Sequence, residues 1–89
     1  MENIMNLTEE RITILTEAAK GREREIMHYQ INIDNYERAI TEIETNYTDP
    51  EILAFAEQLK NLLASSKLEQ TKEQIMLKVI KEQLECMSD

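Results

Sequence analysis

Residues 12–47 read ITILTEAAKGREREIMHYQINIDNYERAITEIETNY, and this stretch decides the fold. Apolar residues recur in it at alternating steps of three and four, which is typical of a coiled-coil heptad seam. We call this series, with Met5 and Thr8 upstream, the first seam; its members here are Ile12, Leu15, Ala19, Arg22, Ile26, Tyr29, Ile33, Tyr36, Ile40, Ile43 and Tyr47. A helix this long is stable in water only when its apolar stripe is covered, so the stretch predicts association with another helix.

The segment around Asp49 and Pro50 contains the clearest helix-boundary signal in the chain. Asp49 is a good helix cap, and proline is favoured at the first position of a helix. Thr8 is a similar capping candidate for the first helix, and we expect a frayed segment before it. These signals predict a helix over residues 8–47, a turn over 47–50 and a second helix over 50–87.

The second predicted helix carries a seam of its own, with a polar middle. This second seam comprises Ile52, Ala56, Leu59, Leu63, Ser66, Gln70, Glu73, Leu77, Ile80, Leu84 and Met87. Two interpretations of the middle are open: a continuous helix, or a kink at Ser65-Ser66 where residues 66–69 form a capping box that opens a third helix. We favour the continuous helix, because the spacing resumes in phase and the stretch contains neither Gly nor Pro. Gly21 in the first helix is interpreted in the same way, as a tolerated weak point on the outer face.

The two seams together predict an all-α fold, a single domain over residues 1–89 in which two helices form an antiparallel coiled-coil hairpin. Charged residues flanking the seams support this pairing, because Glu23, Glu37 and Glu44 would face Lys60, Lys67 and Lys81. Polar seam members would also meet, with Arg22 close to Gln70 and Glu73. Tyr29, Tyr36 and Tyr47 lie on the first seam and are expected to pack in the core.

Composition excludes several classes of function. The chain has 89 residues and a net charge of -8, which argues against direct binding to nucleic acid or to anionic membranes. No apolar run is long enough to span a bilayer, and no secretory signal is apparent, so we expect a soluble cytoplasmic protein. His28 has no suitably spaced metal-ligating partners, and Cys86 is expected to pack beside Leu84 and Met87. We therefore predict no catalytic residues, no metal and no cofactor.

A hairpin of two helices leaves apolar residues uncovered. Those off the seams are Leu7, Ile14, Met27 and Ile31 in the first helix and Leu53, Phe55, Leu62, Leu68, Ile75, Met76 and Val79 in the second. An exposed apolar stripe on a short chain is typical of a binding surface or an oligomer interface. The predicted partner-binding residues are Phe55, Leu62, Leu68, Met76 and Val79.

The acidic chain, the long first helix containing residues 17–21 (EAAKG), the turn at residues 48–50 (TDP) and the leucine-rich second helix resemble the small helical-hairpin chaperones of type III secretion needle subunits. The resemblance implies a cytoplasmic chaperone that joins a helical-repeat co-chaperone and keeps a secreted subunit soluble before export. Two other hypotheses remain open at this point. One is an acidic phage-type inhibitor that imitates the charge of DNA, and the other is a structural homodimer.

Overall fold

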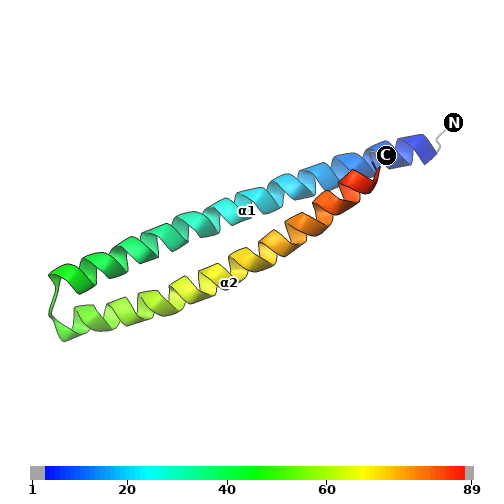
Figure 1. Cartoon of the computed structure of the whole chain (residues 1–89). Coiled ribbons are helices and arrows are strands. Elements are labelled where there is room, and N and C mark those ends of the chain that lie inside the picture. The colour runs from blue at the N-terminus through cyan, green and yellow to red at the C-terminus, as the bar shows by residue number, and fades with distance from the viewer. Residues whose placement is uncertain (1–3, 88–89) are drawn as a thin grey trace.

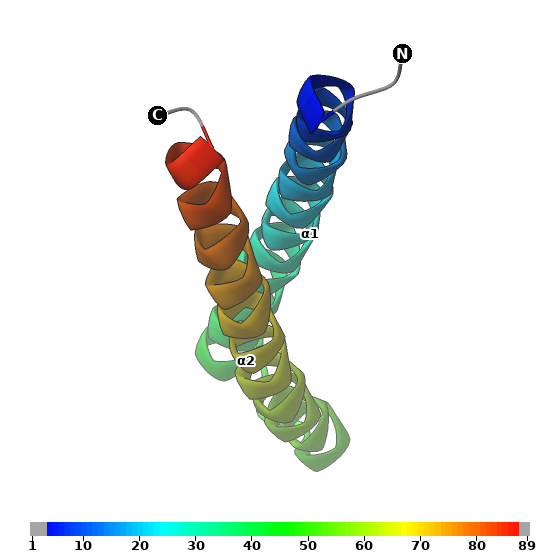
Figure 2. The same cartoon turned by 90° about the vertical axis from the view of Figure 1, so that its right-hand side faces the viewer.

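The computed structural model describes residues 4–87 of the chain, and side chains from Leu7 to Met87. It consists of two helices, α1 (Ile4–Asn46) and α2 (Pro50–Met87), that run antiparallel and contact each other along their length (Figure 1). The described residues contain no strand and measure 71 × 17 × 14 Å. Viewed from the end, the helices cross rather than lie strictly parallel, as packed helices do (Figure 2). The predicted all-α hairpin is confirmed.

The connection between the helices is short because Asp49 starts α2 directly. Its Oδ1 atom accepts a hydrogen bond of 2.8 Å from the backbone N–H of Glu51, and its carbonyl oxygen accepts one of 2.9 Å from Leu53. These bonds satisfy amides at the start of α2 that have no partner within the helix. Pro50 takes the first helical position, where its missing N–H costs nothing. A turn of three residues leaves the following helix no room except alongside α1.

The core lies between the two seams and is most complete near the turn. Its largest cluster is formed by Ile40, Ile43, Ala56 and Leu59, against which Tyr36, Ala39, Ile52 and Leu63 pack. Further along the rod, the buried residues are Ala19, Ile33 and Ile80. Ala56 and Ala19 are small seam residues, and this allows the two backbones to approach each other closely.

A polar layer interrupts the seam at mid-length. The Arg22 Nη1 atom lies 2.9 Å from Glu73 Oε2, which confirms that these two seam residues meet. Gln70 donates from Nε2 to the carbonyl oxygen of Ile26 at 3.1 Å and to Gln30 Oε1 at 3.0 Å. Polar groups at seam positions are satisfied only in one alignment of the helices, so this layer favours a single register.

The second helix is continuous through Ser65-Ser66, as we favoured, and no third helix begins there. Gly21 likewise lies within an unbroken α1, and a methyl group added at its position would contact nothing within 4 Å. Both observations have the same cause. The seam on either side of each weak point stays in phase, so packing against the other helix holds the local conformation.

Three predictions near the helix ends were wrong or fall outside the described part. Helix α1 begins at Ile4, so Thr8 lies inside it and is not its cap; nothing in residues 4–7 breaks a helix. α1 ends at Asn46, and Tyr47 is 46% exposed rather than in the core, because the chain turns toward Asp49 immediately after the last helical residue. The frayed segment that we expected before Thr8 is wrong for residues 4–7, which belong to α1. Residues 1–3 and the Met5 side chain lie outside the part of the chain that the structure describes.

Candidate protein-binding surface

One edge of the hairpin is covered by ion pairs between the helices. We call it the lysine edge, and its pairs are Glu44–Lys60 (2.8 Å), Glu37–Lys67 (3.8 Å) and Glu23–Lys81 (3.7 Å). They are spaced by whole heptads, and the level between the last two carries Gln30 and Gln74 instead of an ion pair. The predicted facing of these charges is confirmed. The side chains involved are about half exposed, so each pair is worth only about 0–1 kcal/mol and contributes mainly to the choice of register.

Lys60 is the most strongly held cation of this edge. Its Nζ atom lies 2.8 Å from Glu44 and 3.2 Å from Glu57, and these hydrogen bonds, first from Glu44 and then from Glu57, raise the pKa of the Lys60 ammonium group. The three lysines of this edge are therefore already engaged with glutamates of α1. Leu53, one position after Ile52, is the exposed large apolar side chain on this edge of α2.

The opposite edge has a different chemistry, and we call it the apolar edge: Phe55, Leu62, Met76 and Val79. The first three each precede a seam residue of α2 by one position, whereas the lysines follow one, so they flank the seam on the other side. Their exposed fractions are 48% for Phe55, 49% for Leu62 and 41% for Met76, and Val79 is 43% exposed one helical turn after Met76. These four predicted partner-binding residues thus share one side of α2.

Leu68 does not belong to this group. It is 57% exposed and lies on the outer face of α2, farthest from the seam, with Ile75 one heptad further on. On α1, the exposed Ile14, Met27 and Ile31 also point away from α2. The structure therefore brings together four of the five predicted partner-binding residues, and it places the fifth around the side of the same helix.

The register across the apolar edge follows from one hydrogen bond. Arg11 donates from Nη2 to Gln83 Oε1 at 3.4 Å near the open end of the hairpin. Moving from this bond along both helices by whole heptads gives four further pairs of facing positions, each at its own level along the rod. They are Ala18 with Met76, Glu25 with Glu69, Asn32 with Leu62, and Ala39 with Phe55. Most of the α1 side chains along this edge are thus small or polar, and they leave the larger α2 side chains uncovered.

Shallow depressions lie at both ends of the apolar edge. The one at the turn has a volume of about 300 Å³ and is lined by Ala39, Glu42, Ile43, Tyr47, Ile52 and Phe55. The one at the open end is lined by Arg11, Val79, Glu82, Gln83, Cys86 and Met87. Sequence reasoning missed the first depression because Tyr47 was assigned to the core. The Asp49-Pro50 helix start, so close after Tyr47, was the signal that could have placed this ring outside α1.

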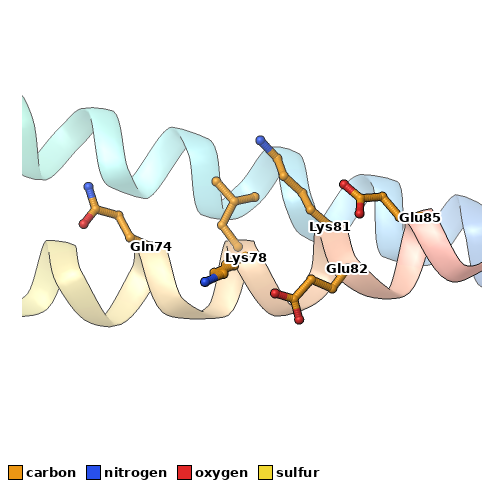
Figure 3. A pocket seen from close by; sticks show the side chains of 6 residues that line it. Gln74, Lys78, Lys81, Glu82 and Glu85 are labelled. Atoms are coloured by element: carbon orange, nitrogen blue, oxygen red, sulfur yellow. The ribbon is translucent and has the colours of Figure 1, made fainter.

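A third hollow lies on the other side of α2, near the lysine edge. Figure 3 shows its lining side chains, and those labelled there, Gln74, Lys78, Lys81, Glu82 and Glu85, point in different directions rather than toward a common centre. Leu77 is its only apolar lining residue. A ligand site usually combines apolar walls with a few convergent polar groups, so this hollow has the wrong chemistry for one.

The residues with potential chemistry do not form a site. His28 is exposed, and no group of three or more His, Cys, Asp or Glu within residues 4–87 is arranged to hold a metal ion. Cys86 is a free, exposed thiol, so its expected packing role was wrong; it lies two residues beyond Leu84 and is thereby turned away from the seam. Over the described residues, neither helix contains a stretch apolar and long enough to cross a bilayer.

Comparisons with protein-family models, with curated proteins and with solved structures gave no match to this chain.

Proposed function

We propose that this chain is a non-enzymatic adaptor or chaperone that binds a helix of a partner protein along its apolar edge. The observation that carries the proposal is the difference between the two edges of one hairpin. On the lysine edge, three levels are closed by an ion pair and one large apolar side chain, Leu53 near the turn, is 38% exposed, whereas on the apolar edge four large apolar side chains are 41–49% exposed. Exposed apolar side chains grouped on one side of a helix are the usual surface for helix-on-helix binding.

The magnitude of the available binding energy supports a real interface. Full burial of a Leu, Phe, Met or Val side chain is worth about 1.5–3 kcal/mol relative to full exposure, so half-exposed side chains still retain roughly half of that gain. Four such residues therefore offer about 3–6 kcal/mol. Association itself costs about 4–15 kcal/mol, so a stable complex also needs contacts from the two end depressions and from the flanking charges.

The proposed partner is a helical protein, either a co-chaperone or a secreted subunit that would otherwise aggregate. This choice follows the resemblance to the hairpin chaperones of type III secretion needle subunits, and it fits the elongated apolar edge. An electrostatic mimic of DNA is less well supported, because three glutamates of the lysine edge are already neutralised by lysines. A structural homodimer through the same edge is the other outcome that an experiment must separate.

The test compares two double variants of matched chemistry. Leu62→Asp with Met76→Asp alters the apolar edge, whereas Met27→Asp with Ile31→Asp makes the same change at exposed residues on the outer face of α1. Circular dichroism should show that both keep their helix content. We expect affinity capture from the source cells, compared quantitatively with the unaltered chain, to lose its specific partners only with the first variant.

Two results would contradict the proposal. If the apolar-edge variant retains every partner while a Glu42→Lys variant loses them, binding is electrostatic. If sedimentation shows that the unaltered chain is a dimer that only the apolar-edge variant dissociates, and no other protein is captured, the chain is a structural homodimer instead.

A further inference from the structure

Two carboxylates occupy the centre of the apolar edge, where a continuous apolar stripe would place hydrophobic residues. The register derived from the Arg11–Gln83 bond puts Glu25 of α1 and Glu69 of α2 at one level, midway between the levels of Leu62 and Met76. Glu69 lies 3.0 Å from Lys72 of its own helix, whereas Glu25 forms no salt bridge within the described residues. On the lysine edge, the level at the same height carries Gln30 and Gln74, and the levels on either side of it carry a glutamate opposite a lysine.

At both ends of the apolar edge, a carboxylate likewise lies next to apolar side chains. Glu42 is the only charged residue lining the depression at the turn, among five residues with apolar rings or aliphatic groups. At the open end, Glu82 lies beside Val79 and Cys86. Neither Glu42 nor Glu82 forms a salt bridge in the part of the chain that the structure describes. Glu25 at the centre, Glu42 at the turn and Glu82 at the open end therefore lie beside apolar residues of this edge without a salt bridge, and Arg11 is the one cation that lines the open-end depression.

From this arrangement we infer that the occupant of the apolar edge is an amphipathic helix of a partner protein with Lys or Arg along its flanks and one Lys or Arg interrupting its apolar stripe at the centre. The inference rests on the proposed function. Phe55 and Val79 are 24 residues apart on α2, and at 1.5 Å per residue the partner helix must extend about 36 Å to contact both. The central cation would lie between Glu25 and Glu69, where it would neutralise two carboxylates that the binding itself removes from water.

Charge disfavours a second copy of this chain as the occupant. A copy presenting the same edge would bring Glu25, Glu42 and Glu69 against an edge that carries the same three carboxylates, and the net charge of -8 adds to that repulsion. The arginines without an ion pair or hydrogen bond among the described residues, Arg24 and Arg38, lie on the outer face of α1. They would not reach the carboxylates in an edge-to-edge dimer, and Arg11, the arginine that does lie on this edge, is at the open end and not at the levels of Glu25, Glu42 and Glu69.

The test uses synthetic helical peptides and the full chain. One peptide of about 28 residues, long enough to span the edge, carries a leucine heptad stripe, a central lysine in that stripe and lysines on its flanks. A second peptide has leucine at the centre, and a third has glutamates on its flanks. Fluorescence anisotropy gives the affinities at several salt concentrations, and sedimentation gives the oligomeric state of the chain.

We expect the basic peptide with the central lysine to bind at least about tenfold more tightly than either of the others, since close charge pairs across interfaces couple strongly. Glu25→Gln with Glu69→Gln should abolish the preference for the central lysine, whereas Glu23→Gln with Glu37→Gln, which removes the same charge from the lysine edge, should leave it in place. Equal loss in both variants would mean attraction by net charge alone, and no preference for the central lysine would overturn the inference.

The two proposals fail in different ways. If the peptides do not discriminate but the Leu62→Asp, Met76→Asp variant still loses its cellular partners, protein binding through the apolar edge stands and the basic character of the partner is wrong. If the unaltered chain proves to be a dimer that must dissociate before a peptide binds, the occupant is a second copy. If neither the peptides nor cellular proteins depend on this edge, both proposals are wrong.

Discussion

Replacement of the polar pair in the middle of the seam provides the sharpest test of the hairpin's register. Arg22 and Glu73 are joined by a 2.9 Å contact, but their environments differ: the Glu73 side chain is 19% exposed and that of Arg22 is 39% exposed. Arg22→Leu therefore leaves a mostly buried carboxylate without its cation, at a cost of about 1–3 kcal/mol in unfolding free energy. Glu73→Leu should cost less, about 1 kcal/mol, because the long arginine side chain can extend into water.

The double variant should recover most of this loss. Two leucines at facing seam positions continue the apolar stripe, and replacing a partly buried ion pair with apolar residues is often neutral or stabilising. We expect a coupling free energy of about 1–3 kcal/mol between the two substitutions. The measurement is urea unfolding followed by circular dichroism, at one fixed protein concentration. Arg24→Leu, at an exposed site on the outer face of α1, is the control for loss of an arginine.

Additive single effects, within about 0.5 kcal/mol, would show that the two residues do not meet and that the register is different. A larger cost for Glu73→Leu than for Arg22→Leu would refute the reasoning from burial. A double variant that keeps its stability but populates more than one oligomeric state would be consistent with the pair's role in selecting one register.

Three further predictions concern stability. Gly21→Ala should raise the unfolding free energy by about 0.5–1 kcal/mol, since alanine favours helix and the added methyl group meets no neighbour; a lower thermal midpoint would contradict this. Leu59→Ala should cost about 2–5 kcal/mol because Leu59 is only 5% exposed, whereas Leu68→Ala should stay within about 0.5 kcal/mol, and chemical unfolding that ranks them otherwise would reject the core assignment. Because the folded-state pKa of Lys60 is raised above 10.5, its stabilising contribution is complete below pH 10.5 and decreases as the pH rises through the folded-state pKa. Lys60→Met should remove that part of the pH dependence in urea unfolding; an unchanged slope would contradict the Lys60 interpretation.

The sequence by itself determined the two helices, their antiparallel packing and the lysine edge. Heptad spacing places Ile33 and Ile40 on one face whatever the partner, and Asp49 with Pro50 starts a new helix through local backbone chemistry. Once two seams with a short turn are given, charges flanking them must face each other, so the three ion pairs could be predicted. The proximity of Arg22 to Glu73 was predictable for the same reason.

The tertiary structure decided what depends on the stagger of the helices and on where each one ends. Ile4 rather than Thr8 begins α1, because a helix continues until something stops it and a capping residue alone does not. Tyr47 lines a depression and does not pack in the core as expected. It lies one residue beyond the end of α1, so the heptad spacing no longer determines where its side chain points. Glu25 and Glu69 share a level only because packing of the whole seam fixes how far one helix is displaced along the other, and no local pattern in the chain encodes that displacement.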